Sequence, residues 1–454
     1  MGALRLFRLS SLLLCLAGLS IGPSALAAGP APEPFFPRAG DPAIDVYNYK
    51  AVLSYKPRSG SIRVAERVSA YASRRLRRFS LDLYGLHVRS VRVNGTVARF
   101  SRGRGKLRIR VAEPVEAGRA FVAVIRYDGR PAAVTDPDGT KEGWIQTEDG
   151  AVALGEPQGT AAWLACNNVP GDKATFQVHL IVPRPLVAVA NGHLSAIEPE
   201  GKRRRYSWRE TRPMSTYLAL IDIGRGRLVK SEIGGLPSWT LLDPRLAKGS
   251  ERVLAQLPEI IRFESRLFGG YPFDAAGSVV DYAPEIGYAL ETQTRPFYAY
   301  VPDLTTVVHE TAHQWFGDSV GIERWPEIWL NEGFATWTEW YYAERHGRRS
   351  AQATFERLYR VPASNEKFWD PPSAHPGTPK HLFGPSVYVR GAMSLQALRE
   401  KIGTKPMLRL LRTWTVEHRY GSATIKEFIA LAEEVSGRDL DPFFQRWLYR
   451  RGKP

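Results

Sequence analysis

Cysteine is nearly absent from this chain, with only 2 among 454 residues. Cys15 falls in an apolar stretch close to the start, and Cys166 stands alone in the remainder. If the first segment is removed, no intramolecular disulfide can form, which excludes the disulfide-rich secreted scaffolds. A single cysteine among apolar neighbours predicts a small buried side chain at Cys166 rather than a reactive thiol.

Long apolar runs are missing as well. No segment after residue 28 has eighteen consecutive apolar residues, so we expect no transmembrane segment in the mature chain. Residues 1–28 have the features of a secretory signal peptide. Arg5 and Arg8 precede an apolar stretch from Leu12 to Ile21, and Ala25-Leu26-Ala27 offers a small-x-small cleavage site. This pattern predicts a secreted or periplasmic protein.

Acidic residues are outnumbered by basic ones, 46 against 62, which gives a formal net charge of +16. Loss of Arg5 and Arg8 with the signal would leave +14. Such a surplus predicts nonspecific attraction to anionic surfaces. The short clusters Arg74-Arg75 and Arg203-Arg204-Arg205 lack the interleaved aromatic residues of a nucleic-acid platform, so we expect no specific nucleic-acid partner.

Histidine is scarce too, with 9 in the chain, yet two of them stand in His309-Glu310-Thr311-Ala312-His313. Residues four apart lie on one face of a helix, so both imidazoles can reach one ion. Glu310 lies one step after His309, close enough to touch a metal-bound water without being a ligand. Glu332 follows His313 after a gap of eighteen residues and can supply a third ligand from a second helix. Three protein ligands leave a fourth position open, which is typical of a catalytic zinc.

Two exposed histidines on an ordinary helix are the alternative interpretation, and the surrounding sequence argues against it. Apolar residues such as Val307 and Trp315 flank the motif, and Gly317 is typical of a helix stop. Pro326 suits the first turn of a second helix that would run to about His346. We therefore expect one Zn²⁺ bound by His309, His313 and Glu332.

The motif, the eighteen-residue gap and the segment Trp329-Leu330-Asn331-Glu332-Gly333-Phe334-Ala335 together resemble the gluzincin zinc aminopeptidases, the group of membrane alanyl aminopeptidase and leukotriene hydrolase. Three further segments extend the resemblance to about residues 45 to 450. They are Glu156-Pro157-Gln158 with Cys166 ten positions after Glu156, Tyr288-Ala289-Leu290-Glu291-Thr292 in place of the family's G-x-M-E-N, and Tyr388-Val389-Arg390-Gly391 for its Tyr-x-Lys-Gly.

This resemblance implies a role for each of four further residues. Glu310 would take a proton from the attacking water and return it to the leaving amine. Tyr388 would donate its phenol to the oxyanion. Glu291 and Glu156 would bind the free ammonium group of a peptide substrate.

Some residues near the expected site depart from the family pattern. Tyr288 and Thr292 replace a glycine and an asparagine, which puts the shape of the first specificity pocket in doubt. Asp318 either orients a ligand histidine or lies at the surface beyond the zinc helix.

The fold we expect is α+β and multidomain. After the signal peptide (1–28), residues 29–228 would form an antiparallel β-sandwich, because short alternating segments are separated by turns such as Asn94-Gly95. Helical spacing begins near Ser250. The resemblance implies a thermolysin-like α/β catalytic domain over 229–403, followed by a short helical tail over 404–454. This tail is too short for the large helical domain of bigger relatives, so we expect a more open cleft unless another subunit covers it.

We thus expect a zinc-dependent aminopeptidase that acts on peptides with a free N-terminus. A zinc endopeptidase on the same fold is an alternative, favoured by the open cleft and by Tyr288. A catalytically silent binding or scaffold homologue is a further alternative, disfavoured because Glu310, Tyr388 and all three ligands are present.

Overall fold

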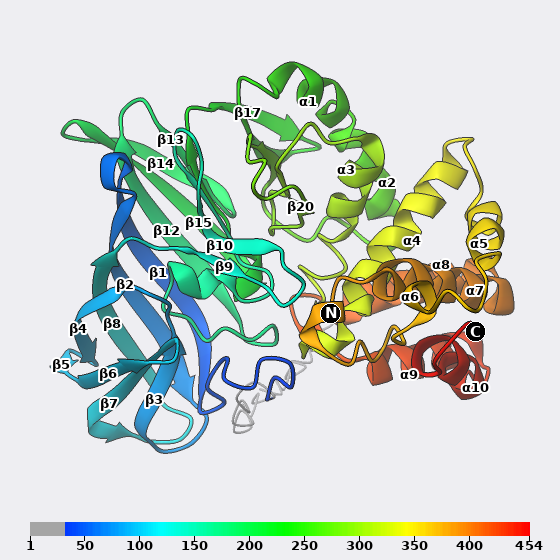
Figure 1. Cartoon of the computed structure of the whole chain (residues 1–454), viewed down its shortest axis with the longest axis horizontal. Coiled ribbons are helices and arrows are strands. Elements are labelled where there is room, and N and C mark those ends of the chain that lie inside the picture. The colour runs from blue at the N-terminus through cyan, green and yellow to red at the C-terminus, as the bar shows by residue number, and fades with distance from the viewer. Residues whose placement is uncertain (1–31) are drawn as a thin grey trace, which may run out of the picture.

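The computed structural model describes residues 32–454, so the predicted signal peptide (1–28) lies outside the described part. A strand-rich half covers the first part of the described chain, and a helical half follows it (Figure 1). No helix within residues 32–454 is long and apolar enough to cross a membrane. The predicted mixture of strands and helices is confirmed.

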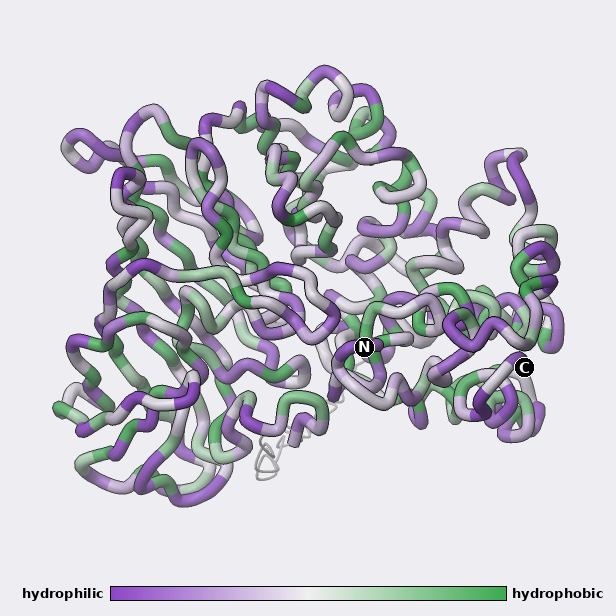
Figure 2. The backbone as a smooth tube through the Cα atoms, in the orientation of Figure 1, coloured by the Kyte–Doolittle hydropathy of each residue, from purple (hydrophilic) through white to green (hydrophobic). Residues whose placement is uncertain are grey.

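The largest sheet of the first half has eight strands, along which apolar and polar residues alternate (Figure 2). Successive side chains of a strand point to opposite faces, so one face of the sheet is buried. In spatial order they are β14 (His193–Glu200), β15 (Arg203–Ser215), β12 (Lys173–Pro183), β1 (Ile44–Lys56), β2 (Ser61–Ala72), β8 (Ala120–Gly129), β4 (His87–Val93) and β5 (Thr96–Val97). One detail of the predicted antiparallel sandwich is wrong, because β1 and β12 pair in parallel, with Asn48 opposite Thr175. Strands far apart in sequence can pair in either direction, and alternation alone does not specify which.

Two smaller sheets complete this half. One has the order β13 (Val187–Ala190), β16 (Ile221–Gly224), β11 (Ala151–Leu154), β10 (Lys141–Gln146) and β9 (Ala133–Thr135). The other has the order β3 (Leu76–Asp82), β7 (Lys106–Val115) and β6 (Arg99–Gly103). Cys166 is fully buried beside β3, as predicted for a small core residue.

The second half begins with a new sheet in the order β17 (Arg227–Ile233), β18 (Leu236–Leu242), β19 (Ala276–Val280), β21 (Phe297–Tyr298) and β20 (Ala289–Leu290). The change of sheet lies between Gly224 and Arg227. The helical stretch expected from Ser250 forms two helices, α1 (Ala247–Leu254) and α2 (Leu257–Phe268), because Pro258 begins a new helix.

The remaining helices surround the motif segments. They are α3 (Leu304–Ala312), α4 (Trp329–Arg345), α5 (Ala351–Tyr359), α6 (Glu366–Trp369), α7 (Gly391–Ile402), α8 (Thr404–Glu417), α9 (Ile425–Ser436) and α10 (Asp441–Phe444). Two short strands, β22 (Gly321–Ile322) and β23 (Ser422–Ala423), pair in parallel and join the tail to the loop after α3. The tail therefore packs on the second half of the molecule rather than standing apart.

Candidate metal centre

Helix α3 presents the two motif histidines to one point. Asp303 caps its first turn by accepting from the backbone N–H of Thr306 at 2.8 Å. His309 and His313 are one helical turn apart, and their Nε2 atoms lie 3.1 Å from each other. Both side chains are largely buried, so their ring nitrogens face a protected space.

Helix α4 adds Glu332 to this pair. Its Oε2 atom lies 3.3 Å from the Nε2 atom of His309 and 3.3 Å from that of His313. Ligand atoms around a tetrahedral zinc stand about 3.3 Å apart, because zinc–ligand bonds measure about 2.0–2.1 Å. The buried Oε2 atom has no hydrogen-bond donor among residues 32–454. This donor set and spacing fit a zinc ion.

A second contact orients each ligand histidine. His309 Nδ1 lies 2.6 Å from Glu339 Oε1, and His313 Nδ1 lies 2.9 Å from the carbonyl oxygen of Phe316. Both partners accept, so each Nδ1 carries the proton and each Nε2 lone pair faces the shared point. Sequence reasoning missed Glu339, although it lies two helical turns after Glu332 on the same face of α4.

The expectations for Asp318 are both wrong. Its side chain is fully buried, so it does not lie at the surface, and Phe316 occupies the position of hydrogen-bond partner to His313. Lys173 instead reaches this loop from β12 and donates to the carbonyl oxygen of Asp318 at 2.7 Å. The loop that follows α3 is therefore tied to the first half of the molecule.

Two glycines let α4 approach α7 closely. A Cβ atom at Gly333 would lie 3.1 Å from the carbonyl carbon of Gly391, and a Cβ atom at Gly391 would lie 3.1 Å from the Cα atom of Gly333. The backbones of the two helices therefore meet directly at these glycines. Glu332 and Tyr388 are thereby brought to the same cavity from neighbouring segments.

Tyr388 lies in a single π-turn, η6 (Ser386–Arg390), directly before α7. Its ring is nearly parallel to that of His309, with an angle of 11° and 6.0 Å between ring centroids. Arg390, where the family has lysine, is fully buried and donates to the carbonyl oxygens of Trp369 and Trp447. The substitution thus anchors the segment that carries Tyr388.

Glu156 and Glu291 approach the metal triad from the two halves of the molecule. Glu156 follows β11, and Glu291 follows β20. One carboxylate oxygen from each lies within 4.8 Å of the others in a group with Glu332. Oε1 of Glu156 and Oε1 of Glu291 are buried without a hydrogen-bond partner in the described part of the chain. Burial and the charge of Glu291 raise the pKa of Glu156.

Glu310 stands beside the triad without joining it. Burial raises its pKa to about 8. A divalent cation bound by the triad would add positive charge nearby and favour the carboxylate form. Glu310 is therefore suited to exchange a proton.

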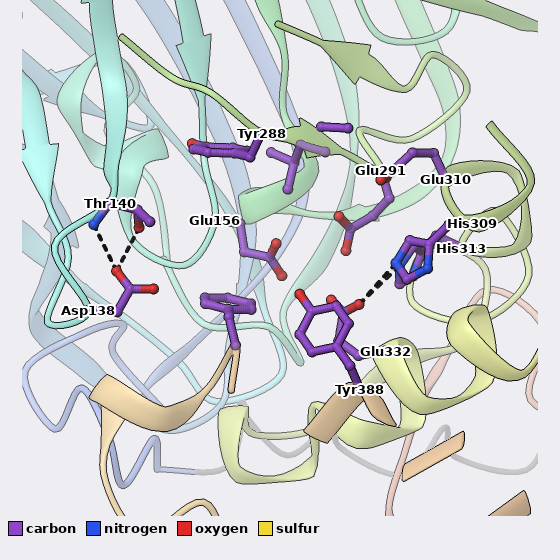
Figure 3. Close-up of a pocket in the computed structure, with 13 residues that line it drawn as sticks. Asp138, Thr140, Glu156, Tyr288, Glu291, His309, Glu310, His313, Glu332 and Tyr388 are labelled. Carbon is purple, nitrogen blue, oxygen red and sulfur yellow. Dashed lines mark hydrogen bonds and ion pairs between the residues drawn. The ribbon is translucent and has the colours of Figure 1, made fainter. Parts of the chain in front are cut away.

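These residues line one cavity of about 150 Å³ (Figure 3). It holds all seven residues named from the sequence: Glu156, Glu291, His309, Glu310, His313, Glu332 and Tyr388. Tyr288 forms part of the wall, and its hydroxyl donates to the carbonyl oxygen of Lys141 in β10 at 2.8 Å. The Thr292 hydroxyl is used within its own turn, where it donates to the carbonyl oxygen of Arg295.

Comparison with known families matches both halves of the chain. The Peptidase M1 N-terminal domain matches residues 146–218, and the Peptidase family M1 domain matches residues 293–447. The second match contains the H-E-x-x-H motif, Glu332 and Tyr388, whereas the first contains Glu156.

Several curated proteins are similar to the chain. A probable aminopeptidase 2 of Sulfurisphaera tokodaii is 25% identical over 321 residues, which cover 64% of this chain and 40% of that protein. Aminopeptidase M1 of Arabidopsis thaliana is 26% identical over 330 residues, with 67% and 37% covered. A leucyl aminopeptidase of Saccharolobus solfataricus is 23% identical over 447 residues, with 90% and 54% covered. The chain therefore spans between about two fifths and half of the length of these relatives.

Solved structures match over nearly the whole described fold. The M1 zinc metallopeptidase of Deinococcus radiodurans has a TM-score of 0.85 and 27% sequence identity, covering 93% of this chain and 97% of its own. A mutant of that enzyme is bound to a Tyr-Ser-Ala substrate, with a TM-score of 0.85. A two-domain M1 zinc metallopeptidase mutant bound to L-arginine matches with a TM-score of 0.86. The shared architecture is that of a two-domain zinc peptidase.

Proposed function

Because this chain belongs to the peptidase M1 family, we propose that it is a zinc aminopeptidase that hydrolyses the N-terminal residues of peptides. One observation carries the proposal. Beside the metal triad, Glu156 and Glu291 hold buried carboxylate oxygens with no protein donor in residues 32–454. Buried carboxylates require a cationic or hydrogen-bonding partner. The ammonium group of a peptide supplies both.

His309, His313 and Glu332 would hold a single zinc ion in this proposal. Bound zinc supplies a Lewis acid that polarises a carbonyl group and lowers the pKa of a water molecule. Glu339 and the Phe316 carbonyl group hold the two imidazole rings in the tautomer that leaves Nε2 free. The protein thus fixes the orientation of its ligands before an ion arrives.

The other side chains of the cavity would transfer the proton, stabilise the negative charge on the carbonyl oxygen and bind the substrate's amine. Glu310 accepts the proton of the attacking water and passes it to the leaving amine. The Tyr388 phenol donates to the oxygen that becomes negatively charged, since its ring packs beside His309 at the same cavity wall. Glu156 and Glu291 hold the substrate's amine, so the bond after the first residue lies opposite Glu310.

The test compares free and N-acetylated forms of the same short peptide with two enzymes, the unmodified protein and Glu291→Gln. Acetylation should abolish cleavage, because it removes the charge that the two carboxylates bind. Glu291→Gln should lower kcat/KM for the free peptide about 10- to 150-fold, since a charge-assisted contact in a desolvated site contributes about 1.5–3 kcal/mol. Equal losses on both peptides would instead assign Glu291 to general structure.

An endopeptidase on the same fold is the second candidate, and the same comparison separates the two. The endopeptidase hypothesis leaves Glu156 and Glu291 without a partner in the cavity, so the geometry favours the aminopeptidase. Efficient cleavage of the acetylated peptide by the unmodified enzyme would reverse this order. A catalytically silent homologue would show zinc binding without turnover of either peptide.

The site of action is part of the proposal as well. The signal-like residues 1–28 support a secreted or periplasmic location. The formal charge of +16 supports nonspecific attraction to anionic surfaces there, with no specific nucleic-acid partner. Fractionation of cells that express the full chain would test the location.

A further inference from the structure

We propose that Asp138 makes this enzyme select peptides whose first residue carries a positively charged side chain, arginine above all. The inference rests on the proposed aminopeptidase function and names its substrate class. It starts from the charge of the cavity. Five carboxylates line the cavity, and within residues 32–454 no lysine or arginine does, although the chain as a whole has a surplus of basic residues.

Four of these five carboxylates already have a role. Glu332 belongs to the metal triad, Glu310 to proton transfer, and Glu156 and Glu291 to the substrate's ammonium group. Asp138 is the fifth, and none of these tasks uses it. A carboxylate in a cavity of this charge favours a second positive group on the ligand.

The Asp138 side chain is aimed at the cavity by its own turn. Oδ1 accepts from the backbone N–H of Thr140 at 2.9 Å and from its hydroxyl at 2.7 Å. Oδ2 makes no hydrogen bond in the described part of the chain and points into the cavity (Figure 3). The turn itself is closed by a hydrogen bond of 2.9 Å from Gly139 N to the carbonyl oxygen of Asp136.

The turn is tied to the parts of the site that bind the amine. Glu142, fully buried in β10, accepts from the backbone N–H groups of Gln158 and Gly159, in the loop that carries Glu156. On the other side, Tyr288 donates to the carbonyl oxygen of Lys141 at 2.8 Å. Asp138 and the amine-binding carboxylates therefore belong to one hydrogen-bonded unit, which keeps their separation fixed.

The position of Asp138 assigns it to the first side chain of the substrate. Glu156 lies between Asp138 and the metal ligands (Figure 3). The first side chain leaves the carbon atom that bears the ammonium group, and on the side of Glu156 away from the metal ligands the same cavity reaches Asp138 (Figure 3). Tyr288 lies on this side of the cavity (Figure 3), and Phe383 also lines the cavity. Aromatic walls suit the planar guanidinium group, which stacks on rings while it pairs with a carboxylate.

The test uses arginine amide and citrulline amide, which have nearly the same shape but differ in charge. We expect kcat/KM to be about 3- to 30-fold higher for arginine amide, because Asp138 is solvent-exposed and a fully buried pair would discriminate more strongly. Raising the salt concentration should reduce this ratio. The variant Asp138→Asn keeps Oδ1 as the acceptor of the turn and should bring the ratio close to one.

Glu148→Gln is the matched control, since it removes the same charge from the next turn of the chain, where Glu148 pairs with Arg245 outside the cavity. It should leave the ratio unchanged. An arginine-to-citrulline ratio of one in the unmodified enzyme, or an unchanged ratio in Asp138→Asn, would overturn the inference while leaving the aminopeptidase intact. Failure to hydrolyse either amide would overturn the proposed function and this inference with it.

Discussion

Two buried carboxylates in the same cavity acquire opposite acid strengths from their neighbours. Burial alone would raise the pKa of Glu332, but positive charge on the two imidazole rings, 3.3 Å from its Oε2 atom, lowers it to about 2, and a cation bound by the triad would supply positive charge at the same point. Burial dominates at Glu310 and raises its pKa to about 8. A carboxylate that stays ionised suits a ligand, whereas one that titrates suits proton transfer.

The variant Glu310→Gln should therefore retain zinc and lose nearly all hydrolysis. Glutamine has almost the same shape, but it cannot take a proton from water, so turnover should fall by a factor on the order of 10²–10⁴. Metal content and turnover are measured on one sample. Loss of zinc, or retention of turnover, would contradict the division of roles between Glu310 and Glu332.

Glu339→Gln should weaken zinc binding without removing a ligand. The carboxylate of Glu339 accepts from His309 Nδ1 at 2.6 Å, and replacing such a partner lowers metal affinity about 10- to 100-fold. Competition with a chelator measures the change. Glu356→Gln, on the exposed face of α5, is a control that should match the unmodified protein.

These residues also show what the sequence can reveal. The spacing of His309, His313 and Glu332 suffices to predict the ligand set, because helix geometry converts spacing directly into direction. The same argument would have found Glu339, seven residues after Glu332. The partner of His313 could not be found in this way. It is the backbone carbonyl group of Phe316, and since every residue has such a group, the sequence does not mark which one accepts the hydrogen bond.

At the scale of elements, the crossing of α4 and α7 decides where Glu332 and Tyr388 meet. Glycines at positions 333 and 391 allow this approach. Aromatic residues continue the packing on either side, with Phe334 5.0 Å from Phe428 and 4.9 Å from Phe316 between ring centroids. The contact joins the loop after α3 to α4 and α9 in one core.

Gly333→Ala should consequently reduce both stability and turnover. Its Cβ atom would lie 3.1 Å from backbone atoms of Gly391, and overpacking of this kind costs about 1–3 kcal/mol. Thermal unfolding and kcat are measured together. Gly103→Ala provides the control, because its nearest neighbour is the end of the Arg108 side chain at 3.5 Å. Unchanged stability in Gly333→Ala would show that the helices can separate without cost.

The ends of helices could be predicted from the sequence only where a particular residue, such as a glycine with a positive φ, terminates the helix. The helix from Trp329 ends at Arg345, close to the expected end, and Gly347 adopts a positive φ of 70° just beyond it. The break between α1 and α2 was missed, since apolar spacing continues through it. The parallel pairing of β1 with β12 was missed for a different reason, because it joins segments more than a hundred residues apart.

At the scale of the molecule, the cavity gathers residues from Asp138 to Tyr388. Glu156 and Glu291 were predicted from the resemblance to a family. The spacing of residues along the sequence alone would not have placed them beside the metal triad. Asp138 lies outside every recognised motif. Only the folded hairpin of β9 and β10 brings it to the cavity, which is why sequence reasoning did not name it.

The fold also buries carboxyl groups that do not line the cavity, and these make the free energy of unfolding depend on pH. Burial raises the pKa of Glu66 in β2 to about 8, and that of Glu210 in β15 to about 8. Glu66 accepts from the Tyr127 hydroxyl at 2.7 Å and from the backbone N–H of Ala165 at 3.0 Å. The folded state therefore holds protons that the unfolded chain, with an ordinary glutamate pKa near 4.3, releases.

The sign of the effect follows from proton binding. Between about pH 4.5 and pH 8 the folded state binds more protons than the unfolded state, so the free energy of unfolding falls as pH rises. The variant Glu66→Gln removes this contribution. Between pH 5.5 and pH 8.5 its free energy of unfolding should therefore fall less than that of the unmodified protein, and the difference should be on the order of 2 kcal/mol. Urea unfolding at both pH values measures the difference. The zinc ligands are the same in both proteins, so their titration cancels in this comparison. The exposed Glu113→Gln should behave like the unmodified protein. Parallel pH profiles for Glu66→Gln and the unmodified protein would mean that Glu66 is ionised in the folded state.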